Sequence, residues 1–580
     1  MGSVNRGTRS TLSIYKRLDS GGSAFAMNNI LTTLDVERSR EFYAHGYWKT
    51  DTLFTLLRDR ATKTPDRFFL RDTNSRLTYR ESLLWVEAIA QDLSVSGVRP
   101  GDRVSIWLPS RMETVLFFLA CSRMGYVCNT SLHRDYTCAE VVGLLERAGS
   151  VALLAQPGYG ADAPTNDIFS MIGGLSKLKR IYRLEPLAPN AAQIDANKRL
   201  GSLAPLVETS VRPSQNPDRV IYLAYTSGTT GRPKGVMHSD NTILANSRAM
   251  VKDWNFDRDT VVYSFSPLSH NIGIVGFAVG LAAGGEVVIH TPFDAMRAFD
   301  RVVETSATFL LGVPTHALDL LAEAHKRNVA TLGNVKAFEI GGSAVPPTLV
   351  RDLMSIGVTT QNAFGMTENH SFLYTRPGDP PDTIASTCGR PAEGMEIKVW
   401  RDTNPNEEVS PHEIGELGVR GASLMLGYFG DQVSTETAFN HDGWFMTGDL
   451  ARIDKLGNLQ IVGRKKDIII RGGHNIHPAK IEDLAMRCQA VAKAAAFPVS
   501  DFRLGERVCL AIIVRSNASI APMDLLSHLK AHGLSKYDMP EYFIELQRFP
   551  LTASGKVVKR RLAELVKEGA LKPQKIRWKG

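Results

Sequence analysis

The chain has 580 residues, of which 43% are hydrophobic and 22% are charged. It is too long for one hydrophobic core, so we expect two or more domains in a globular protein of ordinary composition. Its six cysteines contain no CxxC pair, which excludes a small disulfide-stapled framework and indicates reduced thiols in a cytosol-like compartment.

The net charge of +8 is concentrated at the C-terminal end, where residues 464–580 contain 22 Lys and Arg but 11 Asp and Glu. Such a region is typical of binding to nucleic acid, a membrane surface or a polyanionic small ligand. No nucleic-acid motif or aromatic stacking platform accompanies it. Two interpretations stay open: a binding site for a phosphate-rich cofactor, and a solvated basic face.

In chain order, residues 1–46 are predicted to form an N-terminal extension. Its first 18 residues, MGSVNRGTRSTLSIYKRL, contain four basic and no acidic residues. This composition fits a transit peptide, a disordered tail, or a start codon placed ahead of the true one, with Met27 as the alternative.

From about Tyr47, helical stretches such as 111–124 and 317–327 alternate with short β-branched runs. These runs are predicted strands: RVSIWLP from Arg103, VALLAQ from Val151, RVIYLAYTSG from Arg219, EVVIHTP from Glu286 and ATFLLGVPT from Ala307. The alternation predicts α/β layers with largely parallel sheets.

Two further features complete the pass along the chain. The uncharged segment 271–285, NIGIVGFAVGLAAGG, is too short and too rich in glycine to span a bilayer, and it predicts a core helix. After LGNLQIVGRKKDIIIRGGHN the pattern changes to a compact α+β unit. We therefore place a domain boundary at Lys466, which gives domains at 47–465 and 466–580.

Residues 225–235, YTSGTTGRPKG, gather glycines, hydroxyl side chains and one lysine in a single loop. Glycines let backbone N–H groups approach a ligand, and hydroxyls and the ammonium add donors and charge, which suits phosphate oxygens. The loop is not a Walker A motif, because Pro233 precedes Lys234 and Gly235 follows it. It is either a flexible surface loop or a phosphate loop of another design.

Further motifs follow in a fixed order: SPLSHNIG, GGSAVPP, QNAFGMTE, GWFMTGDL, GRKKDIIIRGGHNIHP and PLTASGKVVKR. With the loop, they resemble the adenylate-forming superfamily of acyl-CoA synthetases, adenylation domains and luciferases, over residues 47–562. The resemblance implies an α/β fold, with a large N-terminal domain of stacked α/β subdomains and a small mobile α+β C-terminal domain. It also implies that a carboxylic acid is activated with ATP and Mg²⁺ and then transferred to a thiol such as coenzyme A.

The resemblance also implies roles for particular residues. The β- and γ-phosphates would lie against Thr226, Ser227, Gly228, Thr229, Thr230, Gly231 and Lys234. The nucleotide would also contact Gly341, Gly342, Ser343, Asn362, Ala363, Phe364, Gly365 and Met366, with Phe364 stacking on adenine. Thr367 would approach the α-phosphate, Glu368 and Thr226 would hold Mg²⁺, and Asp449 with Arg464 would bind the ribose.

In the C-terminal part, Lys556 in TASGKV matches the lysine that bridges the carboxylate and the α-phosphate during adenylation. Lys466 matches the hinge about which the small domain turns between the two half-reactions. Gly472 and Gly473 would line the path of pantetheine. Lys480 departs from the family, whose members usually carry Glu at this position, and we interpret it as a surface change that could affect domain docking.

His270 matches the residue beside the bound carboxylate, and the apolar segment after it predicts a pocket that includes Asn271, Gly273 and Gly342. An acid with an apolar body (aryl, alicyclic or medium-chain) is therefore favoured over an amino acid. Asn271 either faces a ring hydroxyl of the substrate or caps the next helix.

The leading prediction is an AMP-forming acid–CoA ligase, cytoplasmic and without a transmembrane segment. A homodimer is open, and nucleic acid is not an expected partner. The alternatives are an adenylating enzyme that loads a carrier protein in trans, a luciferase-like oxygenase and a catalytically dead nucleotide-binding regulator. Intact Lys556, Asp449 and Glu368 disfavour the last of these.

Overall fold

A computed structural model describes residues 30–187, 212–226, 233–289, 293–343, 345–515, 518–551 and 557–578. The predictions for Ser227, Gly228, Thr229, Thr230, Gly231 and Lys556 lie outside the described residues. No described helix is long and apolar enough to cross a membrane.

The larger part of the chain is built on two mainly parallel sheets. The first has nine strands in the order β15 (Arg390–Pro391), β14 (His370–Tyr374), β13 (Thr359–Met366), β12 (Ala337–Ile340), β11 (Phe309–Gly312), β9 (Val261–Ser264), β10 (Glu286–Ile289), β1 (Phe68–Arg71), β2 (Arg76–Thr78). The second has six, in the order β6 (Arg180–Arg183), β5 (Ser150–Ala155), β3 (Arg103–Trp107), β4 (Val127–Asn129), β7 (Val220–Thr226), β8 (Lys234–Ser239).

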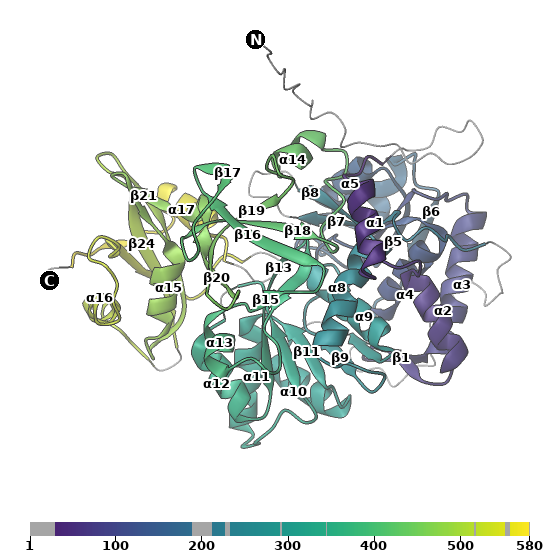
Figure 1. Ribbon diagram of the computed structural model, residues 1–580, viewed down its shortest axis with the longest axis horizontal. Coiled ribbons are helices and arrows are strands. Elements are labelled where there is room, and N and C mark those ends of the chain that lie inside the picture. The colour runs from purple at the N-terminus through teal and green to yellow at the C-terminus, as the bar shows by residue number, and fades with distance from the viewer. Residues whose placement is uncertain are drawn as a thin grey trace, which may run out of the picture.

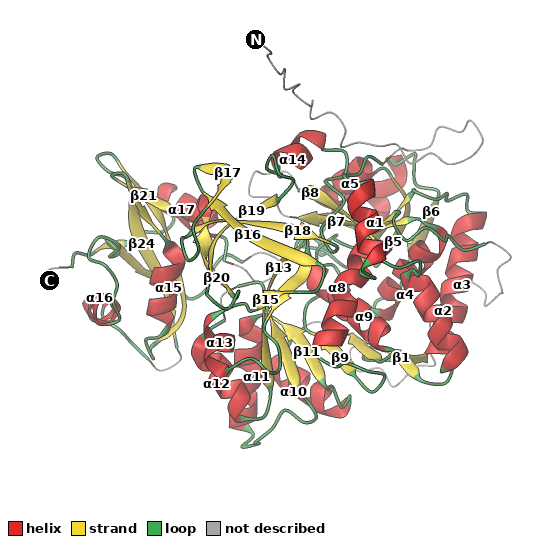
Figure 2. Ribbon diagram, viewed as in Figure 1, coloured by secondary structure: helices red, strands yellow, loops and turns green. Residues whose placement is uncertain are grey.

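Helices between the two sheets bury apolar side chains from both of them in one core, which joins the sheets into a single layered body (Figure 2). They are α2 (Leu53–Lys63), α3 (Tyr79–Val95), α4 (Met112–Met124), α8 (Asp240–Asp253) and α9 (Asn271–Ala283). On the outer face of the nine-stranded sheet a second core packs under α10 (Ala295–Glu304), α11 (Pro314–Lys326), α12 (Pro347–Ser355) and α13 (Pro381–Ser386). The outer face of the six-stranded sheet is covered by α5 (Cys138–Ala148) and α6 (Ile168–Met171).

Two smaller sheets follow. A five-stranded antiparallel sheet has the order β17 (Asn404–Glu408), β16 (Met395–Arg401), β18 (Gly415–Gly421), β19 (Phe445–Ile453), β20 (Leu459–Arg464), and α14 (Gln432–Thr437) lies between β18 and β19 in sequence. The last sheet has the path β22 (His474–Ile476), β21 (Ile469–Arg471), β24 (Gly505–Val514), β25 (Tyr542–Glu545), β26 (Gln574–Lys575), with β23 (Val491–Asp501) also paired to β24. With α15 (Pro478–Met486), α16 (Pro522–Ala531) and α17 (Lys559–Lys567), it forms a separate lobe with its own core (Figure 1).

The predicted fold class and elements are confirmed. All five predicted strands are present, as β3, β5, β7, β10 and β11, and the predicted helices are α4 and α11. The segment from Asn271 is the helix α9, buried over most of its length. The chain changes sheets between Arg464 and Ile469, and we propose that the domain boundary lies at Lys466, as the sequence predicts.

The described end of the predicted extension is structured. It holds α1 (Val36–Ala44), whose N-cap Asp35 accepts bonds from two backbone N–H groups of the first turn. Tyr43 Oη donates to Asp218 Oδ1 over 2.9 Å, and the Thr33 N–H donates to the Leu426 carbonyl over 3.0 Å. Residues 30–46 are therefore held against the large domain.

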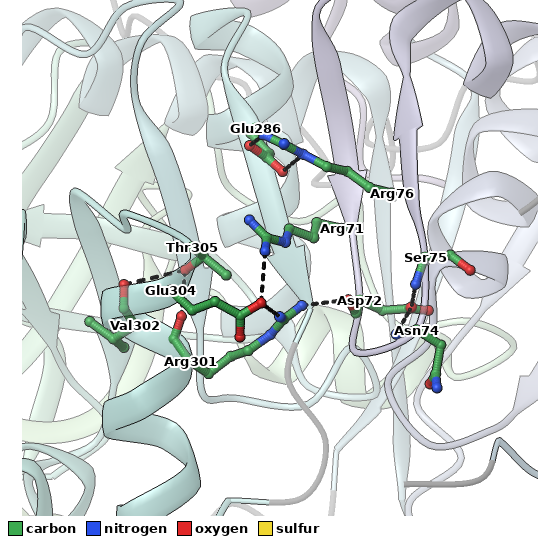
Figure 3. Close-up of polar contacts among 10 residues, drawn as sticks. All are labelled: Arg71, Asp72, Asn74, Ser75, Arg76, Glu286, Arg301, Val302, Glu304 and Thr305. Carbon is green, nitrogen blue, oxygen red and sulfur yellow. Dashed lines mark hydrogen bonds and ion pairs between the residues drawn. The ribbon is translucent and has the colours of Figure 1, made fainter. Parts of the chain in front are cut away.

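An ionic network ties the hairpin β1–β2 to β10 and α10 (Figure 3). Arg76 makes a bidentate pair with Glu286, at 2.8 and 2.6 Å, and its guanidinium lies 3.6 Å from the Phe68 ring centroid. Arg71 and Arg301 both contact Glu304, at 3.0 and 2.8 Å. Bidentate arginine pairs fix orientation as well as charge, so this network positions the sheet edge.

Asp240, the first residue of α8, joins the starts of α2 and α8. Its Oδ1 accepts from the Leu53 N–H over 2.9 Å and from Ser122 Oγ over 2.8 Å, while burial raises the pKa of its carboxyl to about 7. Asp51 raises this pKa further and Arg248 lowers it. The folded protein thus retains a proton that the unfolded chain loses near pH 4, and the stability from this group is lost as pH rises from 4 to 7.

We therefore expect the unfolding free energy of the Asp240→Asn variant to increase, relative to that of the parent protein, as pH rises. The difference in unfolding free energy should shift by about 4 kcal/mol between pH 4 and pH 8, from ~1.4 kcal/mol per pKa unit. Calorimetric melting of both proteins at pH 5, 6, 7 and 8 measures it. A melting-temperature difference that does not change with pH would contradict the expectation, whatever constant cost the asparagine adds.

Candidate functional site

Strands β7 and β8 flank the predicted phosphate loop in sequence and pair with each other. Thr226 ends β7 and is the Cα partner of Lys234, which begins β8. Lys234 Nζ lies 4.7 Å from the ring centroid of Tyr428, and Tyr428 Oη donates to Glu368 Oε1 over 3.0 Å. The lysine and the carboxylate predicted to act on ATP are thus joined through one tyrosine.

Thr367 and Glu368 form the turn between β13 and β14. The Met425 N–H donates to the Glu368 carbonyl over 2.7 Å, and His238 Nε2 contacts the Thr367 carbonyl at 2.7 Å. Burial raises the pKa of Glu368, and the nearby charges of Lys234 and Arg464 act against this rise. A nearby cation favours the charged form of a buried carboxyl group, so a bound metal ion would lower this pKa further.

Asp449 and Arg464 lie opposite each other on β19 and β20. They are Cα partners, and Arg464 Nε donates to Asp449 Oδ1 over 2.9 Å. Asp449 is 3% exposed, although it follows Gly448, whose φ of +75° makes a sharp bend. The strand pairing and the bond from Arg464 therefore hold this carboxylate in one orientation.

The predicted adenine-side residues lie at the ends of β12 and on β13. Gly341, Gly342 and Ser343 follow β12 directly, and residues 362–366 end β13. Phe364 is half-buried and packs edge-on to Phe372 at 6.1 Å, while Asn362 Nδ2 donates to the Ile384 carbonyl over 3.0 Å. Gly365 must be glycine, because a Cβ there would lie 1.9 Å from the His370 carbonyl oxygen.

His270 and Asn271 stand at the start of α9. His270 is the N-cap residue, and its ring stacks on His133 at 4.2 Å with 17° between the planes. Asn271 Oδ1 contacts His370 Nδ1 at 3.0 Å. Asn271 is inside the helix, so the alternative that it caps this helix is wrong.

Gly273 has a structural reason to be glycine. A Cβ at this position would lie 2.4 Å from the Pro267 carbonyl oxygen, so the helix start packs against its own preceding loop. Its role as a pocket residue stays a prediction.

The hinge candidate Lys466 lies in the 3-10 helix η2 (Lys465–Asp467) between the two lobes. Burial lowers the pKa of its ammonium, and Asp449 and Glu368 are among the charges that raise it, which places Lys466 near both. Gly472 and Gly473 form the exposed turn between β21 and β22, both with positive φ. Lys480 Nζ lies 4.0 Å from Asp538 Oδ2, within its own lobe.

Three contacts of the site were missed by sequence reasoning. They are the Tyr428–Glu368 bond, the His370–Asn271 contact, and the pair of Lys465 with Glu416 at 2.8 Å, which anchors the residue beside the hinge. Tyr428 and Glu416 stand in no motif quoted above. His370 follows the QNAFGMTE motif by two residues, which was the one available signal.

Comparison with known proteins agrees with this geometry. A family model described as "AMP-binding enzyme" matches residues 57–429, and its C-terminal domain model matches residues 480–556. The chain is 28% identical over 534 residues to a medium-chain fatty-acid–CoA ligase of Escherichia coli (strain K12), covering 91% of this chain and 93% of that protein.

The chain is also 30% identical over 537 residues to 2-hydroxy-7-methoxy-5-methyl-1-naphthoate–CoA ligase of Streptomyces carzinostaticus. This match covers 90% of this chain and 94% of that protein. Among solved structures, ATP-bound MatB from Rhodopseudomonas palustris superposes with a TM-score of 0.78 at 25% identity, covering 90% of this chain and 100% of that one.

Proposed function

Since the chain belongs to the AMP-binding enzyme family, we propose that it is an AMP-forming acid–CoA ligase for an apolar-bodied carboxylic acid. The observation that carries the proposal is the gathering of Lys234, Glu368, Asp449 and Arg464 around one site at the junction of three sheets. These charges match the phosphates and ribose of one nucleotide.

The reaction has two steps. A carboxylate oxygen of the acid attacks the α-phosphorus of ATP, the bond from this phosphorus to the bridging oxygen breaks, and pyrophosphate leaves. The thiolate of coenzyme A then attacks the acyl carbon, the bond to the AMP oxygen breaks, and AMP leaves with the electron pair. Activation is needed because a carboxylate oxygen is a poor leaving group, whereas AMP is a good one.

Each predicted residue has a task in the first step. Lys234 and the loop before it would hold the β- and γ-phosphates, with Thr367 at the α-phosphate. Asp449 and Arg464 would orient the ribose, and Phe364 would contact adenine, together with Gly341, Gly342 and Ser343 and with Asn362, Ala363, Gly365 and Met366. His270 would lie beside the substrate carboxylate, and Lys556 would bridge it to the phosphate.

Mg²⁺ fits the donor set of this site. Glu368 and Thr226 offer oxygen ligands only, as this hard cation prefers. No group of three or more His, Cys, Asp or Glu able to hold a metal occurs in the described part of the chain. The cation would therefore be shared between protein oxygens and the phosphates of ATP, whose charge it neutralises.

For the second step, we propose that the 466–580 lobe turns about Lys466 and brings Gly472 and Gly473 to the large domain. The exposed turn of these glycines supports this, because a narrow pantetheine chain needs an unobstructed path. Coenzyme A is the simplest acceptor. A carrier protein acting in trans is the second candidate. The six free cysteines support a cytoplasmic setting.

The test is incubation of the full chain with ATP, Mg²⁺, coenzyme A and a panel of aryl, alicyclic and medium-chain acids, read by mass spectrometry. We expect AMP, pyrophosphate and an acyl-CoA. Release of ADP and phosphate would refute the ligase assignment. Adenylate and pyrophosphate exchange with poor turnover of coenzyme A would favour carrier-protein loading instead.

A further inference from the structure

A cluster of polar side chains is buried inside the apolar core between the nine-stranded sheet and helices α8 and α9. We name Asn246, Glu339, Gln361 and Ser371 the polar cluster. Each is at most 5% exposed, and none belongs to the nucleotide site described above. They come from four different elements, α8, β12, β13 and β14.

Hydrogen bonds join three members of the polar cluster. Asn246 Nδ2 donates to the Ser371 carbonyl over 2.7 Å, and Ser371 Oγ donates to Glu339 Oε1 over 2.6 Å. Gln361 is the Cα partner of Glu339 on the neighbouring parallel strand. Paired residues of adjacent strands project from the same face of a sheet, so Gln361 and Glu339 lie side by side.

Several atoms of the polar cluster lack hydrogen-bond partners among the described residues. They are Glu339 Oε2, both amide atoms of Gln361 and Asn246 Oδ1, all buried. Glu339 and Gln361 do not satisfy each other although their strands are paired. Buried polar groups are nearly always hydrogen-bonded, so we expect each of these atoms to bond to a ligand or to an ordered water.

The face that carries the polar cluster is the one that α9 covers. Leu311 is the Cα partner of Glu339, and a Cβ on Gly276 of α9 would lie 3.5 Å from Leu311 Cδ1. This is the helix whose first turn holds the substrate-side residues His270 and Asn271.

The polar cluster also lies close, along the chain, to residues predicted to lie beside the substrate. Glu339 lies on β12 and precedes Gly341, just after the strand, by two residues, or about 7 Å of extended chain. Ser371 follows His370, which contacts Asn271. A carboxylic acid bound beside His270 and Gly341 would therefore reach Glu339 and Gln361 with the far side of a single ring.

We propose that the polar cluster is the distal wall of the acyl pocket and selects a ring-bearing carboxylic acid that carries a hydroxyl group at its far end. This inference rests on the proposed ligase function. A hydroxyl both donates and accepts, so it can donate to Glu339 Oε2 and accept from Gln361 Nε2. A plain alkyl or aryl acid would leave both unpaired.

A neutral hydroxyl fits better than an ammonium group. Burial raises the pKa of Glu339 to about 7, and the hydrogen bond from the Ser371 hydroxyl acts against this rise. The carboxyl is therefore partly protonated near neutral pH, and a cationic substrate group would lose its hydration without a full counter-charge.

The experiment compares kcat/KM for matched acids that differ by one hydroxyl. The pairs are the three hydroxybenzoates with benzoate, 3-(4-hydroxyphenyl)propanoate with 3-phenylpropanoate, and 4-hydroxycyclohexanecarboxylate with cyclohexanecarboxylate, with octanoate as the open-chain acid. We expect at least one hydroxylated acid to exceed its plain partner by about 10²-fold or more, because sites built to bind a hydroxyl strongly reject analogues that lack it.

Two variants and a control assign the discrimination to the polar cluster. Gln361→Leu and Glu339→Gln should each lower the ratio for the preferred pair by about tenfold or more. The circular dichroism spectrum of each variant, compared with that of the parent protein, reports folding. Thr360→Val is the matched control. Thr360 is equally buried next to Gln361 but faces the other side of the sheet, so the ratio should not change.

The outcomes separate this inference from the function on which it rests. Thioester formation with no preference for hydroxylated acids, or a preference that survives both variants, would overturn the inference and leave the ligase assignment intact. The polar cluster would then be a water-filled structural feature. Failure to release AMP and pyrophosphate with every acid would instead refute the proposed function itself.

Discussion

Replacement of Lys556 by alanine is expected to lower the rate of adenylate formation by roughly 10²–10³-fold, as removal of one preorganised donor to a developing charge does elsewhere. The first step brings a carboxylate toward a triphosphate, and two like charges must share one site. A lysine between them offsets this repulsion in the transition state. Pyrophosphate exchange measures this step directly.

The same variant should form thioester normally from a supplied acyl-adenylate. In this intermediate the carboxylate is already bonded to AMP and pyrophosphate has left, so the repulsion that Lys556 offsets is absent. Lys567→Ala is the matched control, since Lys567 is an exposed lysine of α17 in the same basic lobe. It should leave both half-reactions unchanged. Equal loss of both half-reactions in Lys556→Ala would show that the role assigned to this lysine is wrong.

Replacement of Lys466 by proline is expected to slow thioester formation by at least an order of magnitude while leaving adenylation much less affected. Proline fixes φ near −65°, a value that a 3-10 helix adopts, so the present arrangement at η2 is compatible with it. The proposed rotation of the lobe would require this dihedral to change, and proline prevents the change. Single-turnover measurement of each half-reaction gives the two rates.

Lys466→Ala distinguishes the effect of the backbone from the effect of the side chain at this position. It removes the ammonium that lies near Asp449 and Glu368 but leaves φ free, so thioester formation should be retained. If alanine and proline slow the second step equally, the side chain and not the hinge is responsible. If neither slows it, the lobe does not turn about this residue.

The elements of the large domain were predictable because local patterns and burial agree there. The runs at Val151 and Glu286 are mostly apolar and every residue of their strands is buried, and strands buried on both faces have this composition. Helix α9 was predictable because an uncharged, apolar segment of 13 residues that ends at a glycine pair fits a core helix. The residues 30–46 were harder, because α1 buries no residue fully and is held by polar contacts far away in sequence.

By itself, the sequence determined the family and the chemistry, because phosphates, ribose and a carboxylate each demand particular residue types in a fixed order along the chain. Only the tertiary structure decided which side chains from distant parts of the sequence are in contact. Tyr428 reaches Glu368 across 60 residues, and Ser371 reaches Glu339 across 32. Such contacts depend on sheet register and on helix packing, which no local pattern records. The same packing buries Glu339 and Gln361 almost completely, and buried polar atoms are costly unless they are hydrogen-bonded.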